Sequence, residues 1–204
     1  MIYRISLDRT MIGTSRITWH SLEGERSSDE EVDIPGMLDQ RQSLWLDTQG
    51  FPTVYRLAAR IQGHDTHIDV QRVPGAIVET VRQGGRTRTR RFASVSPVDW
   101  LDNNSFDTLQ ALLDRNRKRL AAGLRLRVFV PQAQRFGEFT VVRAQTEKPA
   151  EAARAQLTLR ISLTVGKDTV PLQLTVNAIN GVLLSYHQPE REVTVSLETA
   201  PTSR

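Results

Sequence analysis

The strict alternation of apolar and polar residues in several segments constrains the fold of this chain more than any other feature. The clearest example is residues 157–165, LTLRISLTV, in which every second residue is a large aliphatic one. The same period of two recurs in residues 124–130 and 172–176. Successive side chains of a strand point to opposite faces, so each segment predicts a β-strand with one buried face and one solvated face.

Short turn sequences divide the first half of the chain into segments of strand length. Pro74-Gly75 and Gly84-Gly85 are examples, because these residue types favour tight turns. Residues 23–31 are polar and are expected to form a loop or a weak strand. The regular spacing of the segments is typical of an antiparallel meander. Strands are predicted at residues 3–7, 11–22, 43–48, 53–62, 67–72, 76–82 and 86–93.

One segment, residues 104–122, has the period of a helix instead. Leu109 and Leu113 fall on one apolar face at helical spacing, whereas Asp107 and Gln110 lie off that face. A helix of this length spans roughly 27 Å and cannot cover the apolar faces of so many strands. Either the sheet curls around the helix, or two sheets face each other, or part of the apolar face stays open for a partner.

The composition is typical of a globular protein with a hydrophobic core. Of the 204 residues, 39% are hydrophobic and 25% are charged, and no stretch approaches the length of a membrane span. The first ten residues, MIYRISLDRT, lack the basic start and apolar run of a secretory signal. The protein is therefore expected to be cytoplasmic if this sequence is complete, and periplasmic or otherwise exported if a signal has been removed.

The sequence contains no motif of a familiar catalytic class. It has no cysteine, no Gly-x-Ser-x-Gly elbow, no phosphate loop, no dinucleotide fingerprint and no His-Glu-x-x-His helix. The histidines and aspartates of residues 63–69, GHDTHID, would need a bent loop and a further ligand to hold a metal. The acidic group Asp29, Glu30, Glu31 and Asp33 is expected to be solvated in a polar loop. We therefore predict that the protein is not an enzyme and has no catalytic residue, metal site or cofactor.

Arginine is concentrated in one predicted hairpin. Arg86, Arg88 and Arg90 alternate along its second strand and therefore project from the same face. The simplest interpretation is a solvated outer face, and the next is contact with an anion or a lipid headgroup. Nucleic acid is not expected, because sheet proteins that bind it usually interleave aromatic residues for stacking, and Phe92 alone follows here.

Three short strings lead to a family resemblance. YRISL at residues 3–7, MIGT at residues 11–14 and LRLRVFVP at residues 124–131 resemble a family of uncharacterised exported bacterial proteins. The order of elements, a long meander, one helical insert and a second alternating meander, resembles the half-barrel of the bacterial Lol lipoprotein carriers. The resemblance covers nearly the whole chain. It implies a curved sheet whose apolar cavity is plugged by the helix and binds acyl chains.

We predict a mainly β fold in which residues 1–204 form a single domain. One curved antiparallel sheet forms a half-barrel, and the helix of residues 104–122 packs on its concave apolar face. The expected function is that of a non-enzymatic binding module of the bacterial envelope, which holds an acyl chain, a lipid or another hydrophobic ligand in the half-barrel. The residues predicted to contact the ligand are Trp100, Phe106, Leu109, Leu113, Leu159, Ile161 and Leu174.

Two other functions stay open at this stage. The protein could be an accessory or protein-interaction domain with a filled core and no ligand, or it could bind anions or nucleic acid through Arg86, Arg88 and Arg90. The partners expected are a hydrophobic small molecule or lipid, or another protein. The discriminating observation is whether an apolar cavity is left once the helix side chains are in place.

Overall fold

A computed structural model describes residues 1–102, 105–145 and 156–199 of the chain. Its first half is a run of strands joined by short turns. These are β1 (Ile2–Leu7), β2 (Thr10–Leu22), β3 (Glu25–Ile34), β4 (Leu38–Leu46), β5 (Pro52–Ile61), β6 (His64–Val73), β7 (Ala76–Gln83) and β8 (Arg86–Ala93). The second half contains β9 (Asp99–Trp100), α1 (Phe106–Leu120), β10 (Leu124–Val130), β11 (Arg135–Gln145), β12 (Gln156–Val165), β13 (Asp168–Asn177), β14 (Leu183–Gln188), the 3₁₀ turn η2 (Pro189–Arg191) and β15 (Val193–Thr199).

Within the described residues, fifteen strands form one continuous sheet. The spatial order is β8-β7-β6-β5-β4-β3-β2-β1-β15-β14-β13-β12-β11-β10-β9. Neighbours pair antiparallel, except that β9 runs parallel to β10. The first and last strands, β1 and β15, pair in the middle of the sheet. The first meander therefore runs outward from the centre to one edge, and the chain then crosses to the other edge and returns to the centre.

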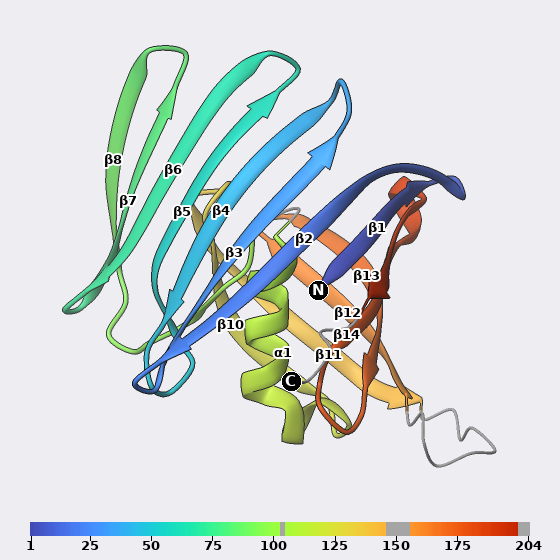
Figure 1. Ribbon diagram of the computed structural model, residues 1–204. Coiled ribbons are helices and arrows are strands. Elements are labelled where there is room, and N and C mark those ends of the chain that lie inside the picture. The colour runs from blue at the N-terminus through green and yellow to red at the C-terminus, as the bar shows by residue number, and fades with distance from the viewer. Residues whose placement is uncertain (103–104, 146–155, 200–204) are drawn as a thin grey trace.

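The sheet curls until its two edges approach each other around α1 (Figure 1). Phe92 of the edge strand β8 packs against Phe129 of β10, with 4.9 Å between the ring centroids. Phe129 in turn contacts Phe136 of β11 at 5.5 Å. Side chains, rather than a ladder of hydrogen bonds, therefore join the two edges in the described part of the chain. The prediction of a curved antiparallel half-barrel with one helix on its concave face is confirmed.

The helix lies close to its predicted position and is buried on more than its apolar stripe. It was expected at residues 104–122 and is found at Phe106–Leu120, while residue 104 lies outside the described residues. Leu109 and Leu113 are almost fully buried, as their spacing indicates. Asp107 and Gln110 are buried too, because the sheet also encloses this polar side of the helix. No helix in the described ranges is long and apolar enough to cross a membrane.

Of the two expectations for residues 23–31, a loop or a weak strand, the strand is found, whereas the expectation that the acidic group is solvated was wrong for Glu30. This region belongs to β3, a strand of 10 residues that pairs along its whole length with β2 and β4. Asp29 and Glu31 point outward, whereas Ser28 and Glu30 point inward and are at most 1% exposed. The physical reason is that the inward positions carry polar groups that bond to one another and to the helix, so the strand lacks an apolar alternation.

Candidate functional site

An apolar cavity of about 320 Å³ opens on the concave face of the sheet, at the N-terminal end of α1. Phe106 and Leu109 of the helix form its floor, and Ile5 and Val195 of the central strands contribute to one wall. The hairpin turns at one end of the sheet supply the rim. The full lining is Ile5, Leu7, Ile12, Ile34, Met37, Leu38, Ile61, Gln62, Leu101, Asp102, Ser105, Phe106, Leu109, Leu163, Leu172, Tyr186, Gln188, Arg191, Val193 and Val195.

The cavity exists because the helix begins part-way along the strands. The inward-facing apolar side chains of the strands extend past the N-terminal end of the helix at Ser105, and there no helix side chain covers them. Leu7, Met37 and Ile61 at the rim are 41%, 53% and 48% exposed, which leaves a band of apolar surface open to solvent. A concave, mostly apolar hollow with a few polar groups at its margin is the usual form of a small-molecule site.

The polar groups of the cavity gather on the side of β14 and η2. Tyr186 donates its hydroxyl hydrogen to the side-chain oxygen of Gln188 at 3.2 Å, and Arg191 follows in the turn. Burial raises the pKa of Tyr186 to about 12, although the Arg191 charge opposes this rise. At neutral pH the phenol is therefore uncharged and can take part in hydrogen bonds as donor or acceptor.

A buried polar network fixes the floor of the cavity to the first meander. Glu30 of β3 accepts the backbone N–H of Asp107 at 3.0 Å, so a strand side chain caps the helix. The side-chain amide nitrogen of Gln42 on β4 lies 2.7 Å from Glu30 and 2.6 Å from both Ser105 and Asp107, so its two hydrogens are shared among three oxygen acceptors. Ser28 also donates to Asp107, at 2.8 Å. The start of α1 is thus held by several hydrogen bonds that exclude water.

Two buried carboxyl groups of this network, those of Glu30 and Asp107, interact with each other. Burial, followed by the charge of Asp107, raises the pKa of Glu30 well above its ordinary range. Burial also raises the pKa of Asp107, which is opposed by hydrogen bonds from Ser28 and Ser105. Glu30 is therefore the member of the pair whose pKa is displaced more strongly toward the protonated form, and as a carboxylic acid it can donate a hydrogen bond to Asp107.

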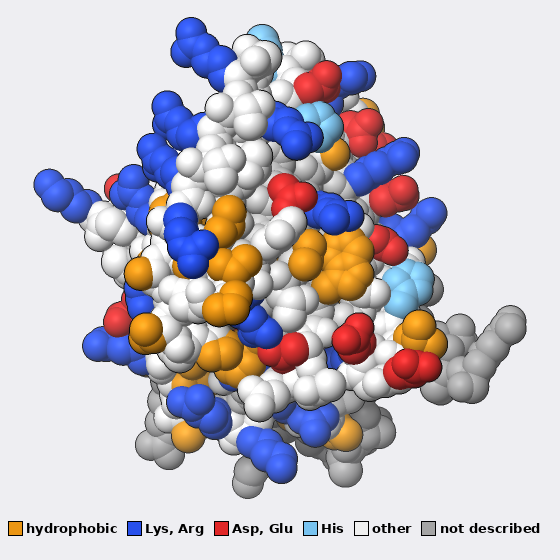
Figure 2. Space-filling model, turned by 90° about the vertical axis from the view of Figure 1, so that its left-hand side faces the viewer, with side chains coloured by type: hydrophobic (Ala, Val, Ile, Leu, Met, Phe, Trp, Pro, Cys, Tyr) orange, Lys and Arg blue, Asp and Glu red, His pale blue; other side chains and the backbone are white. Residues whose placement is uncertain are grey.

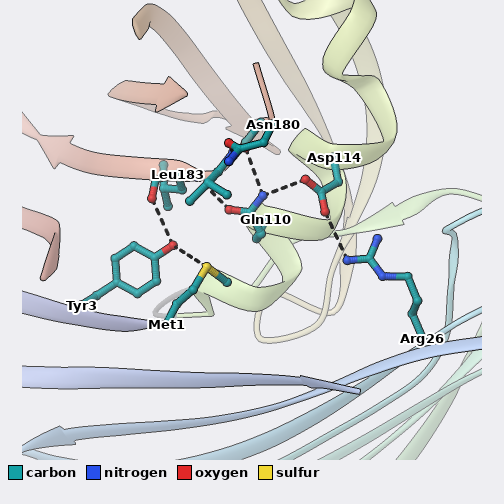
Figure 3. A network of polar contacts seen from close by, with 9 residues as sticks. Met1, Tyr3, Arg26, Gln110, Asp114, Asn180 and Leu183 are labelled. Atoms are coloured by element: carbon teal, nitrogen blue, oxygen red, sulfur yellow. Dashed lines mark hydrogen bonds and ion pairs between the residues drawn. The ribbon is translucent and has the colours of Figure 1, made fainter. Parts of the chain in front are cut away.

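A second set of contacts fixes the helix to the other meander. The side-chain oxygen of Gln110 accepts the backbone N–H of Leu183 at 2.8 Å, and its amide donates to Asp114 at 2.9 Å (Figure 3). Asp114 also accepts a hydrogen bond from Arg26 of β3 at 3.2 Å. The helix is therefore connected to both halves of the sheet.

A second hollow of about 440 Å³ lies beside the cavity, between the ends of β5–β8 and the turn before β11. Arg86 and Arg88 line it, opposite Gln132 and Gln134. Arg86 and Arg88 are exposed to solvent, as the solvated interpretation expects, but their pairing with β7 turns them to the concave side rather than to the outer face. Figure 2 shows lysine and arginine side chains around the margins of the side that carries β6–β8, and on one of these margins acidic side chains lie among them.

The comparisons with known proteins show a similar fold in a solved structure, but they do not assign the chain to a family. No protein-family model and no curated protein matches the chain. A β-barrel-like protein of the domain of unknown function DUF1849 from Brucella abortus has a similar structure, with a TM-score of 0.59 and 12% sequence identity. The match covers 96% of this chain and 92% of that one. A DUF1089 family protein from Pseudomonas aeruginosa matches with a TM-score of 0.47 and 10% identity, over 87% of this chain and 90% of that one.

At 12% identity, the similarity to the Brucella abortus protein shows the fold alone. It agrees with the expected β half-barrel, whereas the specific resemblance to the Lol carriers is not confirmed. The sheet, the helix and their order along the chain are therefore those of a known architecture, and the site must be argued from its own residues.

The residues predicted to contact a ligand occupy three different places. Phe106 and Leu109 line the cavity. Trp100 faces a separate hollow beside Pro74 and Val98, and its buried indole N–H has no hydrogen-bond partner among the described residues. The other four, Leu113, Leu159, Ile161 and Leu174, are at most 4% exposed and belong to the core around the helix rather than to the cavity lining.

Sequence reasoning missed most of the cavity wall. Ile34, Leu38 and Ile61 come from the ends of three strands, and Leu172 and Val193 come from the second meander. All of them belong to alternating or turn-flanking positions, so the pattern marks them as inward-facing or terminal. No signal in a single segment shows which inward residues lie above the helix and which lie beside it.

The histidine cluster does not form a metal site. Within the described ranges, no group of three or more His, Asp or Glu side chains could hold a metal ion. Asp65 and Asp69 of β6 instead form ion pairs with Arg60 and Arg56, at 2.8 and 3.5 Å. These pairs lie on the solvated face of β5 and β6.

Proposed function

We propose that this protein is a non-enzymatic binding module of the bacterial envelope, and that its cavity holds an acyl chain or a similar hydrophobic ligand. The observation that carries the proposal is the open apolar cavity of about 320 Å³ above the helix. Its volume falls at the lower end of the range for small-molecule sites, and most of its lining is aliphatic. A single unbranched chain is the ligand shape that suits such a lining.

The energetics support the same conclusion. Each methylene transferred from water into an apolar site contributes about 0.8 kcal/mol, so even a short chain gains several kcal/mol. The floor is held by the network of Glu30, Gln42 and Asp107. A floor that is already ordered does not have to be fixed when the ligand binds, which lowers the entropic cost of association.

The test is a titration with parinaric acid, a fatty acid whose fluorescence rises in an apolar environment. We expect saturable binding to the wild-type protein and a loss of at least tenfold in affinity for Val193→Trp, because the larger ring enters the cavity. The matched control is Val142→Trp, at a position that is 56% exposed outside the cavity. This control is expected to bind as the wild type does.

Two results would contradict the proposal. No saturable signal with the wild-type protein would favour an accessory or protein-interaction domain without a ligand. Equal binding by the wild type and both variants would place the probe elsewhere on the protein. Thermal melting of each variant is needed alongside, so that a loss of binding is not confused with a loss of fold.

A further inference from the structure

The second hollow combines an apolar floor with cations that have no ion-pair partner. Leu57, Ile68 and Val81 form part of its floor, and Arg86 and Arg88 stand on one side. Neither arginine forms an ion pair with another described residue, whereas Arg56, Arg60 and other arginines of the same half are paired. An arginine needs a hydrogen-bond acceptor for its charge-assisted contacts, and here an external anion can supply one.

The strand register places both arginines on the concave side. Arg88 lies opposite Val81, and Arg86 lies opposite Gln83, whose partner Thr66 also lines the hollow. Partners in an antiparallel ladder share a face of the sheet, so the two guanidinium groups extend above the apolar floor. They are two residues apart on one strand, which separates their backbones by about 6.7 Å.

The second hollow adjoins the apolar cavity. Ile61 lines both of them. Asp102 of the cavity accepts the backbone N–H of Gln132, which lines the hollow, at 3.2 Å. A ligand whose chain lies in the cavity can therefore extend past Ile61 toward Arg86 and Arg88.

We propose that Arg86 and Arg88 bind the phosphate head of a single-chain amphiphile whose acyl chain occupies the apolar cavity. This inference rests on the proposed function and names the class of its ligand. A carboxylate has two oxygens and is satisfied by one guanidinium, whereas a phosphate monoester presents three oxygens and up to two charges. Two separated guanidinium groups match the phosphate better. The side chains of Gln132 and Gln134 can bind an adjoining polar linker.

The rival cation at the rim, Arg191, is a weaker anchor for a phosphate. It stands alone in η2 and is flanked in sequence by Glu190 and Glu192, whose charges offset its own. Glu79 is the buried carboxyl group nearest in the sheet to the arginine pair, since its cross-strand partner is Arg90. Burial raises the pKa of Glu79 to about 8, so at neutral pH this carboxyl group is largely protonated and does not cancel the positive charge of Arg86 and Arg88.

The experiment compares two fluorescent amphiphiles with the same acyl chain, a lysophosphatidic acid and a monoacylglycerol. We expect the double variant R86Q/R88Q to bind the phosphate-headed probe at least tenfold more weakly and the neutral probe within twofold of the wild type. The matched control is R82Q/R91Q, which removes two charges from the opposite face of the same hairpin. It is expected to change neither affinity. Glycerol phosphate and inorganic phosphate are tested alone as competitors.

The outcomes separate this inference from the proposed function. Binding of both probes by R86Q/R88Q with wild-type affinities would overturn the phosphate site and leave the acyl cavity intact. A selective loss with Arg191→Gln instead would place the head at the other rim and also overturn it. Displacement of the lysophosphatidic acid probe by an equal concentration of inorganic phosphate would mean that the acyl chain adds nothing to the affinity, which would contradict the inference. If neither probe binds the wild-type protein, both the phosphate site and the proposed function are overturned.

Discussion

Replacing Glu79 by glutamine is expected to make the protein more stable at alkaline pH and to leave it nearly unchanged in acid. Glu79 is fully buried on β7, and neither carboxyl oxygen has a hydrogen bond of good geometry. Burial raises its pKa from 4.5 to about 8, and the nearby Gln134 and Arg90 partly oppose this. The folded protein therefore holds a proton that the unfolded chain releases between these two pH values.

The sign of the pH dependence follows from this proton. Below pH 4.5 the group is protonated in both states and its full contribution to stability is present. As the pH rises toward 8, the unfolded state gains stability by ionising while the folded state does not. One pH unit corresponds to about 1.4 kcal/mol for a single proton, so the loss amounts to as much as about 5 kcal/mol. That is a large part of the stability of an ordinary domain, about 5 to 15 kcal/mol.

The assay is urea unfolding of the wild type and Glu79→Gln from pH 5 to pH 9. Glutamine mimics the protonated carboxyl group, so the difference in unfolding free energy should increase with pH and level off above the folded-state pKa. The subtraction removes the pH dependence of Glu30, which is the same in both proteins. Glu25→Gln, at an exposed position of β3, serves as the control with a small difference. A difference between wild type and Glu79→Gln that does not vary with pH would refute the reasoning.

Two further predictions concern the helix. Leu109→Asp should lower the unfolding free energy by more than about 3 kcal/mol, because it buries an unpaired charge. Lys118→Asp, on the exposed side of the helix, should lower it by less than about 1 kcal/mol. Urea unfolding compares the two variants, and equal losses would mean that the helix is not docked as described. Arg115→Ala should cost about 3 kcal/mol because it leaves Asp99, 4% exposed, without its ion-pair partner. Arg4→Ala, from an exposed pair, should cost under about 1 kcal/mol in the same urea unfolding measurements, and similar costs for Arg115→Ala and Arg4→Ala would contradict this difference.

The sequence predicted the fold because most strands follow a simple physical rule. In β12 the residues Leu157, Leu159, Ile161 and Leu163 are all buried, as their alternation requires. The rule failed in β3, where Glu30 takes an inward position that an aliphatic residue usually occupies. A buried carboxyl group is stabilised by partners on other elements, such as Gln42 and Ser15, and those partners are not visible in a local pattern.

The candidate site was less predictable than the fold. Sequence periodicity identified Phe106 and Leu109 as inward-facing, but the cavity depends on where the helix begins relative to the strand ends. The arginine strand posed a different difficulty. From Arg86 to Arg90 one face carries arginine and the other carries threonine, so both faces are polar and the strand itself carries no inside or outside signal. Its register with the apolar residues of β7 decides which face is inward.

The pairing of β1 with β15 has a consequence for how the chain folds. Each meander is built from neighbouring strands that can pair soon after collapse, whereas this central ladder joins Ile2 to Thr199. Closing a loop of that length has a high entropic cost before any contact compensates for it, and such non-local pairing slows folding. We therefore expect the two meanders to form first and the central seam last, so that amide protons of β1 become protected later in refolding than those of β4 and β5.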